Sequence, residues 1–247
     1  MLKLGLFARR NFAVGNLETL TMYAGLAILF FFLVIYLQQV AGYSALRSGF
    51  VTLPVTIVMF LLSRRFGMLA DRLGPRLFMG GGPLVAAGGI LLLLRTGMHV
   101  SFVWDLLPGL LLFSLGLSLT VAPLTATVLA DADESDAGIA SAVNNAVARV
   151  AGLIGVSVIG VVVASRLAGD TFAANHESVR AFHESLLICA GLVGAGGLTG
   201  LAWIVNPRLP VRAEGCPGGQ LAGVPEPAAR ASGGPEAILD QLQPQEA

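Results

Sequence analysis

Residues 67–77 read GMLADRLGPRL and separate two long apolar runs, at 46–63 and 77–95. Each run approaches the roughly 20 apolar residues that a helix needs to cross a lipid bilayer. The polar segment between them, from Arg64 to Arg76, is therefore predicted to be a short loop that joins two membrane helices on one side of the membrane.

The residues of this segment suit such a connection. Gly67 removes a side chain at a point where two membrane helices can approach closely. Gly74 and Pro75 predict a turn, because glycine tolerates positive φ and proline fixes φ. Asp71 carries a negative charge that the positive end of a neighbouring helix would favour.

The chain as a whole is unusually apolar. Of its 247 residues, 55% are hydrophobic and 12% are charged, and the mean hydropathy is +0.78. A typical soluble domain has about 25% charged residues, so the composition argues against a soluble enzyme or a nucleic-acid-binding protein. We predict an all-α membrane protein whose six transmembrane helices form a bundle, with spans at 13–38, 46–63, 77–95, 106–130, 138–165 and 184–205.

The basic residues near the span ends predict the orientation in the cell membrane. With the N-terminus in the cytoplasm, nine of them lie inside and four outside, and lysine and arginine prefer the inner side. Both termini are therefore expected in the cytoplasm. The predicted organisation is a lead-in at 1–12, a bundle at 13–206 and a disordered cytoplasmic tail at 207–247, which is too poor in large apolar residues to fold.

The basic residues of the loop have two possible roles. Arg72 and Arg76 can pair with Asp71, or with an acidic residue of the next inner joint such as Glu134. Such a cluster would latch helices in one conformation and release them in another. Alternatively, the arginines only set the topology of the chain.

Polar residues inside the span at 138–165 are candidates for a substrate cavity or gate, because ionisable groups in membrane helices are usually functional. Ser141, Asn145 and Arg149 recur every four residues and share one helix face, and Asn144 lies beside them. The alternative is that Arg149 extends to the inner headgroups while the asparagines bond to neighbouring helices.

The first span has three further candidate residues. Glu18 lies inside an apolar run, and it is either a proton site or an interfacial carboxylate that meets Arg9 or Arg10. Tyr23 and Gln38 can contact substrate, although aromatic residues near membrane interfaces usually serve as anchors.

Two segments carry a resemblance to a known family. Residues 67–77 resemble the signature that the major facilitator superfamily has after the second helix of a six-helix half. Residues 138–152, with the pair Asn144 and Asn145, resemble the fifth helix of the C-terminal half in its fourteen-helix drug:proton antiporter branch. The resemblance implies one half of an efflux transporter that works by alternating access, with the coupling carboxylates in the other half.

This resemblance implies partners and leaves alternatives. We expect the lipid bilayer, a missing N-terminal half or second copy, a small amphiphilic substrate and protons as partners, and no nucleic acid. We expect the chain to be a fragment, a truncated product or a half-size subunit, and to be inactive alone. It could also be a regulatory remnant or a membrane subunit that needs a separate ATPase. There is no GxSxG, HExxH or P-loop motif, so we expect no enzyme activity, cofactor or metal.

Overall fold

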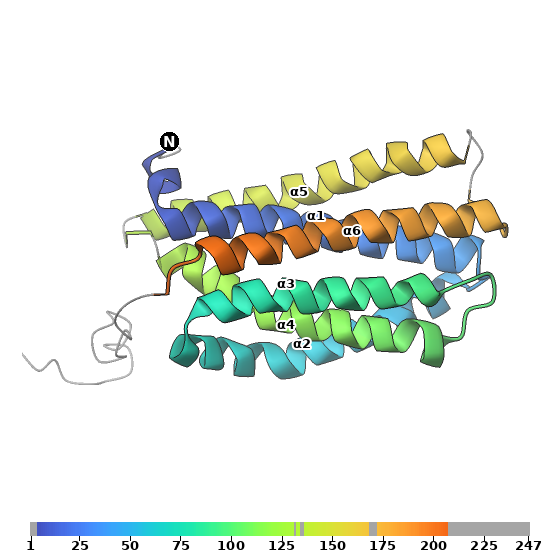
Figure 1. The fold of residues 1–247 in the computed structure, drawn as a ribbon, viewed down its shortest axis with the longest axis horizontal. Coiled ribbons are helices and arrows are strands. Elements are labelled where there is room, and N and C mark those ends of the chain that lie inside the picture. Colours follow the sequence, from blue (N-terminus) through green and yellow to red (C-terminus); the bar gives the residue numbers. More distant parts are fainter. Residues whose placement is uncertain (1–3, 131, 134–135, 168–171, 207–247) are drawn as a thin grey trace, which may run out of the picture. The chain divides into compact units, whose positions relative to one another are not determined.

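The computed structural model describes residues 4–130, 132–133, 136–167 and 172–206 (Figure 1). In this part of the chain, six helices are long and apolar enough to cross a membrane, which confirms the predicted helical class. The helices are α1 (Arg10–Gln39), α2 (Ala45–Leu73), α3 (Pro75–Leu92), α4 (Leu107–Ala130), α5 (Ala137–Arg166) and α6 (His176–Trp203). A 3-10 turn, Leu4–Ala8, precedes α1; another, Leu93–Arg95, follows α3; and a π-helical turn, Phe102–Leu106, leads into α4.

Two predicted boundaries are wrong. The segment from Arg64 to Leu73 is the last part of α2 and not a loop. The helix stops where Gly74 adopts a φ of +90° and Pro75 starts α3, so the turn is shorter than expected. Likewise, α6 begins at His176 rather than near residue 184, because the Asn175 side chain accepts a hydrogen bond from the Ser178 amide at 2.8 Å and caps the helix.

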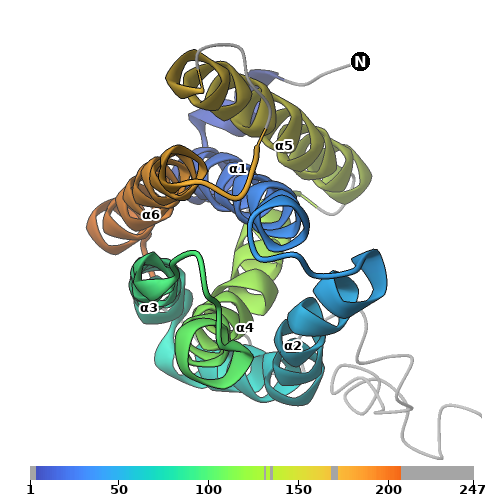
Figure 2. The same ribbon diagram turned by 90° about the vertical axis from the view of Figure 1, so that its right-hand side faces the viewer.

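Helix α1 lies at the centre of the bundle, between α4, α5 and α6, while α3 packs against α4 and α6 (Figure 2). Helices α2 and α5 lie at the edges and are the least covered. In the most apolar stretch of each helix, 17% of residues are buried in α2 and 22% in α5, against 44–56% in the others. We call the side of the bundle that α2 and α5 flank the α2–α5 face.

Helices α3 and α4 touch through their backbones. A Cβ atom added to Gly89 would lie 2.3 Å from the backbone nitrogen of Phe113, and one added to Gly116 would lie 2.3 Å from that of Ala86. Small residues permit this approach, and it replaces side-chain interdigitation with direct helix-to-helix contact. The pair therefore forms a closely packed wall behind α1.

The two ends of the bundle are joined differently. At the end that holds the start of α1, which we call the Arg10 end, Asn11 exchanges two hydrogen bonds with the backbone of Val205, at 3.1 and 3.0 Å. At the opposite end, the Gln39 end, the Tyr36 ring stacks on Phe182 with centroids 4.2 Å apart, and the Tyr36 hydroxyl donates to the Gly97 carbonyl. Both ends thus tie α1 to later segments of the chain.

Candidate functional site

A mostly apolar cavity of about 180 Å³ lies between α1, α2 and α4. Its lining includes Met22, Tyr23 and Phe30 of α1, Thr56 and Met59 of α2, and Thr120 of α4. The Thr120 hydroxyl already donates to the Gly116 carbonyl at 2.9 Å, so it offers less to a ligand than Tyr23 and Thr56 do. Drug-sized ligands occupy pockets of about 300–1,000 Å³, so this cavity can hold one part of such a molecule.

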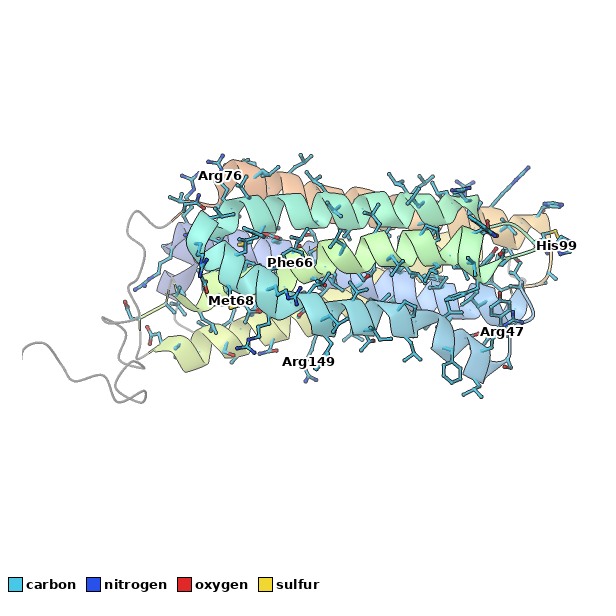
Figure 3. The ribbon with its side chains drawn as sticks, turned by 90° about the horizontal axis from the view of Figure 1, so that it is seen from below. Arg47, Phe66, Met68, Arg76, His99 and Arg149 are labelled. Atoms are coloured by element: carbon cyan, nitrogen blue, oxygen red, sulfur yellow. The ribbon has the colours of Figure 1, made fainter. Side chains whose placement is uncertain are left out.

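The predicted polar face of α5 is present, and it is not covered by other helices. Asn145 is exposed, and its side chain donates to the Ser141 carbonyl at 2.9 Å. Arg149 is exposed as well, and within the described residues it forms no hydrogen bond or ion pair. Figure 3 shows Arg149 projecting from α5 at the edge of the bundle where α2 also lies, which is the α2–α5 face.

Asn144 has a different environment from Asn145. Its side-chain nitrogen donates to the Thr19 hydroxyl at 2.7 Å and to the Asn16 side-chain oxygen at 3.3 Å, so it joins α5 to α1. This matches the alternative in which an asparagine bonds to a neighbouring helix. The sequence reasoning missed Asn16 and Thr19, although two polar residues one turn apart in an apolar run were a usable signal.

Glu18 is fully buried, and neither carboxylate oxygen has a hydrogen-bond partner within the described residues. One oxygen lies 3.1 Å from where a Cβ atom of Gly200 would be, so the side chain occupies space that this glycine of α6 leaves open. The interfacial alternative is not observed: Arg9 pairs with Asp133, and Arg10 donates to the Trp203 carbonyl at 2.8 Å. A buried carboxylate without partners is costly and therefore notable.

The residues predicted to form the latch lie at the Arg10 end, but few of them form a hydrogen bond or an ion pair. Gly67 faces Ala122 of α4, and a Cβ atom there would lie 3.4 Å from it, which is an ordinary van der Waals contact, so the predicted need for a glycine at this point stays a prediction. Arg76 turns toward α6, donating through its side chain to the Leu201 carbonyl at 2.6 Å. Asp71 and Arg72 are exposed and form no hydrogen bond or ion pair with the described residues.

The latch itself stays a prediction. Glu134, its predicted partner, lies outside the described residues. The ion pair observed nearby joins Arg9 to Asp133, which links the start of α1 to the connection between α4 and α5. The backbone N–H of Arg76 donates a hydrogen bond to the Asn206 side-chain oxygen at 3.0 Å, so the segment after α6 caps the start of α3.

The two remaining candidates of α1 are far apart. Tyr23 lines the apolar cavity and is half-buried. Gln38 lies fifteen residues further along the helix, about 22 Å away at the Gln39 end. One substrate group cannot contact both, so only Tyr23 belongs with the cavity.

Six membrane-length helices in the described part of the chain, three of which line an apolar cavity, define a helical integral membrane protein. Comparison with known families agrees with this class: the Major Facilitator Superfamily matches residues 4–156. The chain belongs to this superfamily.

Several relatives are exporters or resistance proteins by name. A protein named "Probable actinorhodin transporter", from Streptomyces coelicolor, is 28% identical over 65% of this chain and 28% of its own length. The "Tetracenomycin C resistance and export protein" of Streptomyces glaucescens is 33% identical over 58% of this chain and 26% of its own. A puromycin resistance protein of Streptomyces alboniger is 32% identical over 73% of this chain and 38% of its own. These matches span about a third of the relatives.

Proposed function

We propose that this chain is the C-terminal six-helix half of a proton-coupled, multidrug-type efflux transporter of the fourteen-helix branch. The α2–α5 face is the observation that carries this proposal. The two helices that flank it are poorly covered by the rest of the bundle. The Arg149 side chain is exposed there, and its charge would be unfavourable in contact with lipid. A second six-helix half on this face would enclose a central site, as in transporters with two related halves.

In this proposal, transport follows from rocking of the two halves around a site near the middle of the membrane. The closely packed α3 and α4 act as a rigid support, and the cavity between α1, α2 and α4 holds part of the substrate. Asp71, Arg72, Arg76 and Glu134 form contacts that exist in only one of the two conformations. The Arg10 end faces the cytoplasm, and the protein resides in the cell membrane.

Glu18 is the residue of this half that we assign to proton coupling, acting together with the carboxylates that the resemblance implies in the other half. Coupling needs a carboxylate in the membrane that can gain and lose a proton as the halves move. Glu18 is 0% exposed and lacks any hydrogen-bond partner in the described part of the chain. Its neighbour Gly200 belongs to α6, so a small shift of α6 against α1 would change the surroundings of the carboxylate.

The substrates are small amphiphilic compounds of the kind that several relatives are named for exporting. The chain alone does not transport, because half of the enclosing wall is contributed by the second half. In this respect the proposal differs from a regulatory remnant, which would gain no activity from a second half.

Inside-out membrane vesicles test the proposal. Vesicles containing this chain alone should show no uptake of tetracenomycin C above empty vesicles. Vesicles in which the chain is co-expressed with the N-terminal half of the tetracenomycin C exporter, or fused to it, should take up tetracenomycin C. A protonophore should abolish this uptake.

Each part of the proposal has its own contrary outcome. Uptake by the chain alone would refute the need for a second half. Uptake that resists the protonophore would refute proton coupling. No uptake by either combination, with both halves folded and inserted, would favour the regulatory remnant.

A further inference from the structure

Arg149 lies too deep in the membrane to be explained as a topology signal. It is twelve residues from the start of α5, which is about 18 Å along the helix axis. If about 30 Å of hydrocarbon is centred on this helix of about 45 Å, the residue lies some 10 Å inside the apolar layer. A guanidinium at that depth needs water, protein or a counter-charge around it.

The contacts between α5 and α1 fix the level of Arg149 relative to the cavity. Asn144 donates to Thr19, and Cβ atoms on Gly152 and Gly155 would lie 3.3 Å from Ala27 and 3.1 Å from Ala24. The two helices therefore run in the same direction, and Arg149 lies at the level of residues 18–24 of α1, a range that includes Tyr23. Tyr23 at this level lines the apolar cavity.

Arg149 is a cation on a mostly apolar exposed surface of α5. Asn145 precedes it by one turn on the same side of the helix, and Figure 3 shows Arg149 at the edge of the bundle where α2 also lies. Leu153, one turn further along, is exposed and apolar, as are Val150, Ile154 and Val158 around the helix. The guanidinium thus projects on the side of the α2–α5 face, among apolar side chains that offer it no counter-charge.

We propose that this half recognises an amphiphilic organic anion that carries an aromatic ring. The acid group binds Arg149, with the Asn145 amide as a second polar contact, and the ring enters the cavity beside Tyr23. A guanidinium is a strong partner for carboxylate, sulfonate or phenolate groups. No acidic side chain lines the cavity in the described part of the chain, so a cationic compound would find no counter-charge there.

The size of the cavity supports the aromatic part of this inference. A dry cavity of about 150 Å³ in another protein is known to hold benzene. The cavity of about 180 Å³ here therefore suits one ring, while the rest of the molecule remains outside it near α5. This inference rests on the proposed function, because it identifies the substrate class of the site between the two halves.

Binding to the purified full chain in lipid nanodiscs tests the inference without transport. Three matched naphthalene probes, bearing a sulfonate, a trimethylammonium or a hydroxyl group, are equilibrated against loaded and empty nanodiscs. The sulfonate probe should bind at least about 10-fold more tightly than the trimethylammonium probe. Arg149→Gln should weaken sulfonate binding by about 10- to 100-fold, as expected on losing a hydrogen bond between charged groups, and Arg149→Lys should retain most of it.

Two variants complete the design. Arg180→Gln, which changes an exposed arginine near the start of α6, should leave all three affinities unchanged. Leu26→Trp, which fills the cavity, should weaken all three probes alike. Far-UV circular dichroism checks that each variant keeps its helix content.

The inference is overturned if the full chain does not bind the sulfonate probe, if the cationic probe binds as well, or if Arg149→Gln changes nothing. These outcomes are separate from failure of the proposed function. The binding assay needs neither a second half nor a proton gradient, so its result is independent of whether the assembled vesicles show uptake.

Discussion

Replacing Gly116 by alanine should weaken the bundle, because the added methyl group meets backbone atoms that cannot rotate away. Its carbon would lie 2.3 Å from the Ala86 nitrogen and 2.5 Å from the Gly82 carbonyl oxygen. Ordinary van der Waals contacts begin near 3.4 Å, so α3 and α4 must separate locally by about 1 Å.

The magnitude follows from the loss of contact along the helix pair. A gap of about 0.5–1 Å removes about a quarter to a half of the dispersion energy of each atom pair that it separates. Overpacking by single methylene groups in well-packed cores costs about 1–3 kcal/mol. Because both obstructing atoms belong to the backbone, we expect Gly116→Ala to lose about 2–3 kcal/mol of unfolding free energy.

Gly81→Ala is the matched control, because Gly81 lies in α3 and a Cβ atom there would have no atom within 4 Å. This substitution should be neutral or stabilise by up to about 1 kcal/mol through helix propensity. Unfolding of both variants in mixed micelles is followed by far-UV circular dichroism as the SDS fraction increases. Equal midpoints for the two variants would refute the backbone contact between α3 and α4.

Three further predictions use single side chains. Asn144→Ala should lower the unfolding free energy by about 1 kcal/mol in the same micelle titration, because an interhelical hydrogen bond is lost, and an unchanged midpoint would contradict that bond. Glu18→Gln should abolish proton-driven uptake by the assembled transporter while substrate exchange continues. The control Glu177→Gln, which changes an exposed carboxylate, should keep both activities. If proton-driven uptake survives in Glu18→Gln, this carboxylate has no part in proton coupling. Tyr36→Phe should cost about 1 kcal/mol and speed hydrogen exchange near Gly97, and unaltered exchange would show that the hydroxyl contributes nothing.

The number and type of helices could be predicted from the sequence because hydropathy reports them directly. The ends of the helices could not. Hydropathy falls at Arg64, yet α2 continues to Leu73, since charged residues are compatible with a helix that leaves the apolar layer. The stop comes from Gly74 and Pro75, which the sequence did identify as a turn.

The candidate site was harder to predict because it depends on which helices become neighbours. Adjacent residues of a helix point about 100° apart, so Asn144 and Asn145 could not share one role. Asn144 bonds to α1, while Asn145 stays exposed. The position of Glu18 depends on Gly200, far away in the chain, and no local pattern reveals that pairing.

The contact between α3 and α4 also limits how this protein can evolve. A contact made by backbone atoms has no side chain that natural selection can alter, and most replacements at Gly89 or Gly116 would force the helices apart. Tolerated mutations must therefore lie elsewhere. The exposed positions of α2, and those of α5 other than Asn145 and Arg149, are the least covered, so related chains should diverge in sequence there and remain glycine-rich along the α3–α4 seam.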